Sequence, residues 1–217
     1  MDRRSSGEQV AAHIRQLIFD GSLQHGDRIR QDEVAETLGV SRIPVREAII
    51  ALDREGWVTI EPHRGAFVQG IDEASVRDHY ELIGLMWGLA AKRAVERGDA
   101  EALAVLVGLQ RDLAASDDVD EFARRNETFV RQLFEMAHSA RLVSQLRVMP
   151  GIVPGNFFAQ VPDAMDTQAR GTGWIVKAVR AGDGEKAADA ALKLLMRQGD
   201  HVVDALAARA FAAAAAS

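Results

Sequence analysis

Residues 31–50, QDEVAETLGVSRIPVREAII, decide the fold of the N-terminal part of the chain. Ala35 is small enough to let two helices cross closely, and Gly39 tolerates the positive φ that a sharp turn requires. Val45 and Ile49 are spaced to hold a second helix against the first. The pattern predicts a helix-turn-helix, with one helix at 31–38 and another that begins after Ser41 and ends near Glu55.

The flanking sequence completes a winged helix. Apolar residues at helical spacing predict a helix over 7–21 on the N-terminal side. On the C-terminal side, Gly56 precedes two short strand-like runs at 57–60 and 66–68, with a turn between them. Three helices followed by a hairpin are the order of a winged helix-turn-helix.

From about residue 72 onward the pattern changes to helix only. We therefore predict a mainly α fold with two domains, a winged helix-turn-helix at 1–71 and an all-helical antiparallel bundle at 72–217. A proline-containing segment at 149–162 interrupts the bundle. Its helices are expected near 74–97, 100–115, 118–137, 139–148, 164–181 and 184–209.

The second helix of the motif carries the candidate DNA contacts. Arg42 and Arg46 are four residues apart, so they share one face, and the positive N-terminal end of that helix also favours phosphate. Guanidinium groups there suit guanine O6 and N7 in a major groove. The alternative is a solvated surface in which Arg46 pairs with Glu36 or Glu47. The hairpin tip is a second candidate, and its alternative is a plain loop without DNA contacts. The candidate DNA-binding residues at the helix start and the hairpin tip are Ser41, Arg42, Pro44, Arg46, His63, Arg64 and Gly65.

Composition restricts the other function classes. The net charge is −6, and residues 1–70 hold 9 Arg and no Lys against 11 Asp plus Glu, so DNA binding would depend on a few placed arginines. The chain has no cysteine and none of the common catalytic motifs, and we expect no enzymatic activity. No apolar run is long enough for a membrane span, and we expect a cytoplasmic protein.

The pieces LGVSRIPVREA, LDREGWV and RGAFV resemble the GntR family of bacterial transcriptional regulators, and the helical remainder resembles the FCD ligand domain of its FadR-like branch. The resemblance implies a homodimer that binds a double-stranded DNA operator under the control of a small-molecule effector. It also implies DNA contacts from Arg42, Arg46 and the residues at 63–65. Where the family often has a basic residue this chain has Asp32, and Arg30 is the candidate substitute.

The resemblance fails at the metal site that many FCD domains build from one Asp and three His. The corresponding residues of this chain are Asn126, Val130, Thr172 and Leu194, which are poor ligands or none. His201 lies two turns beyond Leu194, where a lone histidine is more often hydrogen-bonded or exposed than a ligand. We therefore predict a pocket without metal or other cofactor.

Without a metal, a carboxylate effector would lack its main anchor, so we expect a neutral or largely apolar effector. The alternative is that the same residues fill a packed core and bind nothing, which leaves a winged-helix module for protein contacts without effector control. The candidate effector-binding residues are His79, Ile83, Trp87, Asn126, Val130, Thr172, Leu194 and His201.

Overall fold

A computed structural model describes residues 5–149 and 151–215, and these form two units. One unit ends at Asp72 and also includes the chain from Leu206 onward; the other is Glu73–Ala205. The expected boundary lay one residue earlier, and the expected helical domain included residues 206–217. Within the described residues, no helix is long and apolar enough to cross a membrane.

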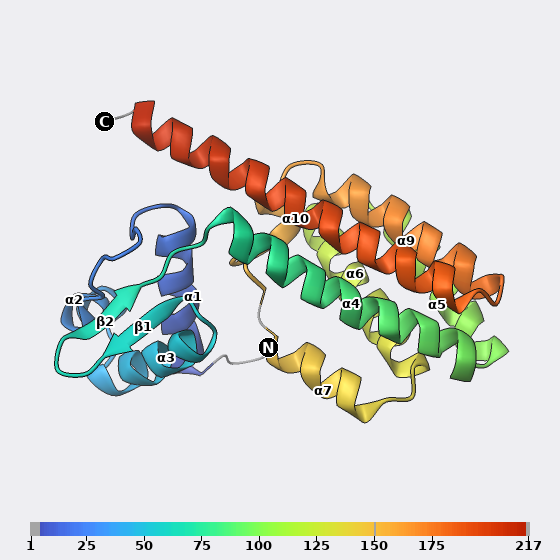
Figure 1. Ribbon diagram of the computed structural model, residues 1–217, viewed down its shortest axis with the longest axis horizontal. Helices are drawn as coiled ribbons and strands as arrows, with labels where there is room; N and C mark the ends of the chain where they lie inside the picture. Colours follow the sequence, from blue (N-terminus) through green and yellow to red (C-terminus); the bar gives the residue numbers. More distant parts are fainter. Residues whose placement is uncertain (1–4, 150, 216–217) are drawn as a thin grey trace. The chain divides into compact units, whose positions relative to one another are not determined.

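The first unit is a three-helix motif with a hairpin (Figure 1). Its helices are α1 (Ser6–Phe19), α2 (Gln31–Leu38) and α3 (Arg42–Arg54), and β1 (Val58–Glu61) pairs antiparallel with β2 (Gly65–Val68). Gly39 ends α2 with φ 63°, as the turn predicted. The first strand begins one residue later than expected. An isolated antiparallel bridge also pairs Arg28 with Phe67 of β2.

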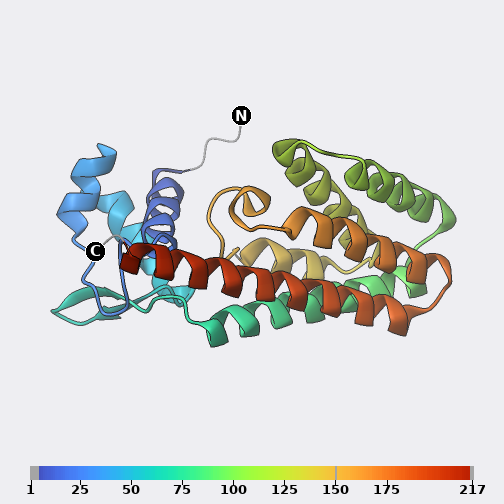
Figure 2. The same ribbon diagram turned by 90° about the horizontal axis from the view of Figure 1, so that it is seen from above.

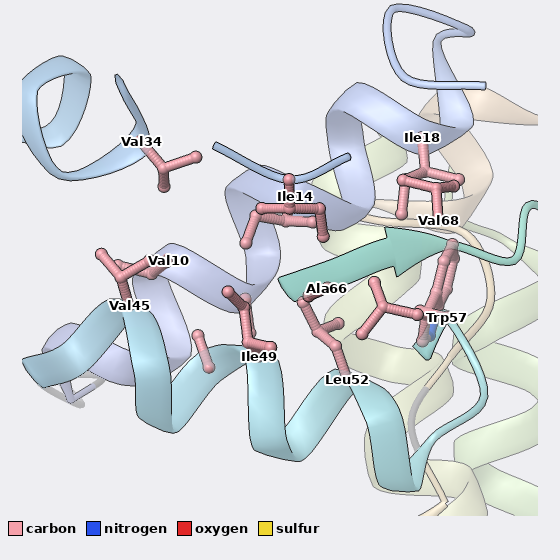
Figure 3. Close-up of a cluster of buried hydrophobic side chains, with 14 of the residues drawn as sticks. Val10, Ile14, Ile18, Val34, Val45, Ile49, Leu52, Trp57, Ala66 and Val68 are labelled. Carbon is pink, nitrogen blue, oxygen red and sulfur yellow. The ribbon is translucent and has the colours of Figure 1, made fainter. Parts of the chain in front are cut away.

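One apolar cluster holds this unit together (Figure 3). Val10 and Ile14 of α1 face Val45 and Ile49 of α3, and all four are at most 3% exposed. The predicted spacing of α3 therefore fixes which of its faces is buried and which faces outward.

The second unit is a helical bundle, and its long helices match the predicted ones within one or two residues except α10, which extends to Ala215 and belongs to the first unit from Leu206 onward. The proline-containing segment contains a short helix that the sequence did not indicate. The helices are α4 (Glu73–Arg97), α5 (Ala100–Ala114), α6 (Val119–Met136), α7 (Ala140–Val148), α8 (Phe157–Gln160), α9 (Ala164–Arg180) and α10 (Gly184–Ala215).

Glycines let α4 and α10 approach closely, and the two helices lie side by side in both views (Figures 1 and 2). A Cβ on Gly84 or Gly88 of α4 would lie 2.9 Å from Leu192 or 3.0 Å from Ala188. A Cβ on Gly199 of α10 would lie 2.9 Å from Tyr80. Because real Cβ atoms rarely approach so closely, this spacing favours glycine at all three positions.

Candidate nucleic-acid interface and effector site

The outer face of α3 carries two arginines. Arg42 is the first residue of the helix and Arg46 lies one turn later, and both are exposed, whereas Val45 and Ile49 are buried. The guanidinium groups therefore extend from the surface of the unit, as a helix that enters a groove requires.

Arg42 is held by a carboxylate from the preceding helix. Its Nε lies 2.6 Å from Asp32 Oδ1, and the two side chains are 73% and 69% exposed. Such an exposed pair is weak, so another anion can replace Asp32. Arg46 forms no ion pair with any residue that the structure describes, including Glu36 and Glu47.

The first turn of α3 leaves its backbone N–H groups available. Ser41 occupies the N-cap position with φ −74° and ψ 169°, but its side chain makes no capping hydrogen bond. The predicted start of the helix after Ser41 is thus correct. Pro44 is half-buried in the first turn, where its missing N–H has no partner to lose.

Ile43 is a surface residue that sequence reasoning missed. It lies between the two arginines and is 68% exposed. The available signal was its position, because Ile43 falls outside the spacing that places Val45 and Ile49 on the buried face. An exposed aliphatic group beside guanidinium groups suits contact with a thymine methyl.

The hairpin tip has a constrained backbone. His63 and Gly65 have φ 63° and φ 113°, and Arg64 pairs with Glu61 while its guanidinium lies 5.4 Å from the centre of the Phe67 ring. Arg64 is therefore partly held against the wing rather than free in solvent.

Arg28, which the sequence analysis did not identify as a candidate, lies at the same hairpin. Its Nε would lie 3.0 Å from a Cβ on Gly65, and its side chain is exposed. The candidate Arg30 is also exposed, at the N-cap of α2, but pairs with Glu33 at 2.7 Å. The wing and α2 thus add three arginines to the two on α3.

The candidate effector residues lie on α4, α6, α9 and α10 of the helical unit. Three of them are buried, with 5% of Trp87, 2% of Leu194 and none of Thr172 exposed. Trp87 packs edge-on against Phe134 at 6.4 Å between ring centres. The half-buried members of the set are His79, Ile83, Asn126, Val130 and His201.

The polar members of this set bond mainly to α9. The Thr172 hydroxyl donates to Gln168 O at 2.8 Å, which lies in its own helix. His201 Nε2 lies 2.9 Å from Thr167 Oγ1, and Asn126 Oδ1 accepts from Gln168 Nε2 at 2.7 Å. Sequence reasoning missed Thr167 and Gln168, because nothing local marks two polar residues of a helix as facing inward.

Burial shifts the pKa of two neighbouring side chains near the start of α4. Burial lowers the pKa of His79 to about 4, so this imidazole is neutral at pH 7, and burial also raises the pKa of the Tyr80 phenol. Within the part of the chain that the structure describes, no three His, Cys, Asp or Glu side chains gather into a group that could hold a metal ion.

Two family models match the chain. The model described as bacterial regulatory proteins of the gntR family matches residues 6–68, and the FCD domain model matches residues 78–198. An HTH-type transcriptional regulator of Mycobacterium tuberculosis is 34% identical over 73% of this chain and 65% of its own length. Another, from Agrobacterium vitis, is 31% identical over 61% of this chain and 82% of its own length. The chain thus spans less than two thirds of the mycobacterial relative.

Solved structures share the fold. Escherichia coli McbR/YncC gives a TM-score of 0.59 at 21% identity, covering 92% of this chain and 97% of that one. A regulator titled GntR from Rhodococcus sp. RHA1 gives 0.54 at 23% identity, covering 93% and 99%. A three-helix motif with a hairpin, followed by a helical bundle, is therefore an arrangement found among solved structures.

Proposed function

The chain belongs to the GntR family of bacterial regulatory proteins and carries an FCD domain. On that premise we propose that it is a homodimeric transcriptional regulator. It binds an operator under the control of a small uncharged effector. The regulator is cytoplasmic and has no enzymatic activity. The observation that carries the proposal is the outer face of α3, where Arg42 and Arg46 are exposed at the positive end of the helix.

Operator recognition divides among the exposed side chains of the first unit. Arg42 and Arg46 read guanine edges, and Ile43 contacts a thymine methyl between them. Ser41, Pro44 and the backbone of the first turn contact phosphate, as does Arg30. The wing residues His63, Arg64 and Gly65, with Arg28 beside them, follow the adjacent minor groove.

The effector occupies the helical unit without a metal. Asn126, Val130, Thr172 and Leu194 replace the four ligands of related domains, and neutral His79 supplies no counter-charge. Trp87, Ile83 and Leu194 give the site its apolar surface, and His201 its polar edge. An effector that binds one arrangement of the dimer better shifts whether both recognition helices meet half-sites one helical turn apart.

The experiment compares operator affinity among matched variants, with the promoter beside the chain's own gene as DNA and fluorescence anisotropy as the measurement. Arg42→Ala and Arg46→Ala should each weaken binding about 10- to 100-fold, because each removes a base contact. Arg131→Ala removes one exposed arginine from the helical unit and should leave the affinity unchanged.

Unchanged affinity in both α3 variants would instead favour the second reading, a winged helix that contacts another protein. That reading predicts no specific DNA binding by the wild-type chain, so the wild-type titration already separates the two.

A further inference from the structure

Three carboxamide side chains form one hydrogen-bonded chain across the helical unit. Gln198 of α10 donates from Nε2 to Gln168 Oε1 of α9 at 3.1 Å, and Gln168 donates from Nε2 to Asn126 Oδ1 of α6 at 2.7 Å. Each link runs from an amide nitrogen to an amide oxygen, so the chain has a direction and two different ends.

The end at α10 is a buried acceptor. Gln198 is 1% exposed, and its Nε2 also donates to Ala164 O at 2.9 Å. Rotating this amide would place Oε1 against the Ala164 oxygen, so the two donated bonds fix its orientation. Its Oε1 then accepts no hydrogen bond from any residue that the structure describes. A buried acceptor without a donor is unfavourable and marks a place where a donor belongs.

The groups that bond to these three amides are polar but uncharged. Among the residues that the structure describes, no carboxylate, ammonium or guanidinium group bonds to any of the three amides. Their neighbours on the same helices are apolar, with Ala164 and Phe129 fully buried and Leu194 2% exposed. A charged ligand would lose its hydration and find no counter-ion, whereas a neutral donor would lose little.

We propose that Gln198 Oε1 is the specificity-determining acceptor for an uncharged ligand that carries a polar N–H donor on an apolar body, as amides and lactams do. Gln168 is a positioning residue, because it holds the Gln198 amide and passes the same orientation on to Asn126. This inference rests on the proposed function, since the ligand is the effector of the helical unit. The proposed function requires only an uncharged effector, and this inference adds that the effector donates an N–H to Gln198 Oε1.

The test uses three probes of similar size with the full-length chain: ε-caprolactam, which has the N–H; N-methylcaprolactam, which lacks it; and hexanoate, which is anionic. Caprolactam at roughly ten times its dissociation constant should raise the unfolding midpoint by about 3–5 °C, and the other two should leave it unchanged. An equal rise with N-methylcaprolactam or hexanoate, or no rise with caprolactam, overturns the proposal.

The matched variants are Gln198→Met and Gln132→Met. Both remove an amide that donates to a backbone carbonyl, at 2.9 Å to Ala164 O and 3.1 Å to Ala102 O. Gln198→Met should abolish the response to caprolactam, and Gln132→Met should keep it. Retention of the response in Gln198→Met overturns the assignment of this atom.

A readout on the wild-type chain covers a Gln198 variant that does not fold. The side-chain amide resonances of Gln168 and Gln198, assigned through bonds, should shift with caprolactam and not with N-methylcaprolactam, and their failure to shift overturns the proposal. Operator binding is measured on the same samples. If the wild-type protein does not bind the operator, the proposed regulator is contradicted. If it binds the operator but does not respond to caprolactam, only the proposed Gln198 site is contradicted.

Discussion

The winged-helix unit and the helical unit keep their polar groups in opposite places. In the first, Arg42 and its partner Asp32 are both more than two-thirds exposed, and Arg46 stands in solvent. In the second, Gln168 and Gln198 are at most 3% exposed and bond to each other. Exposed charge suits a ligand that is itself a polyanion, and buried neutral polarity suits one that leaves water entirely. The proposed functions therefore assign opposite ligand chemistries to the two units.

The largest expected effect comes from a substitution that creates a cavity in the core of the helical unit. Phe129 is fully buried, so Phe129→Ala should lower the free energy of unfolding by about 3–5 kcal/mol, measured by urea denaturation. Thr128→Ala, one residue earlier and exposed, should stay within about 0.5 kcal/mol. A small effect of Phe129→Ala would mean that this face is not packed as core.

The second prediction concerns the half-buried imidazole of His79 in α4. The pKa of His79 is lowered to about 4, so between pH 6.5 and 4 the unfolded chain binds a proton that the folded chain does not. Stability should therefore fall as the pH decreases through this range, by about 2 kcal/mol at pH 5 from this group alone. His79→Gln should remove that part of the pH dependence in urea denaturation, while exposed His63→Gln keeps it. An unaltered pH profile in His79→Gln would contradict the burial of a neutral imidazole.

A third prediction uses one substitution in both units. Gly65 has φ 113° and faces Arg28, so Gly65→Ala should cost about 1–2 kcal/mol through strain at the hairpin. Gly108 of α5 faces open space, and Gly108→Ala should add about 0.5–1 kcal/mol of helix stability. Thermal unfolding of the two variants gives the comparison, and equal signs would contradict it.

The smallest expected effect concerns Asp32. Asp32→Asn should change stability by less than about 1 kcal/mol, because the pair with Arg42 is exposed. It should tighten binding to random-sequence DNA by about two- to fivefold, because a carboxylate no longer faces phosphate. Anisotropy titrations measure this, with Glu101→Gln in the helical unit as the control. Weaker binding to random DNA would mean that Asp32 assists phosphate contact through Arg42.

Sequence reasoning succeeded where structure is local. The turn at Gly39 and the buried face of α3 follow from spacing within 20 residues, and α2 was predicted with its observed bounds. The helix α8 was missed because Phe157–Gln160 is a single turn within a proline-containing segment.

The contacts that were missed join residues far apart in the chain. The amide chain from Gln198 to Asn126 links three helices, and a helix pattern does not show which polar residues will meet. The Thr172 hydroxyl, a predicted effector contact, donates to a carbonyl one turn back, as threonine in a helix commonly does, and its role toward a ligand stays a prediction.

The close approach of α4 and α10 couples sequence change on one helix to the other. At Gly84, Gly88 and Gly199 any added carbon would meet an atom of the opposite helix at 3.0 Å or less. A larger residue at one of these positions therefore requires the facing residue to shrink or both backbones to separate. Substitutions at this contact are therefore expected to occur in compensating pairs, although 86 residues, 98–183, lie between the two helices in the chain.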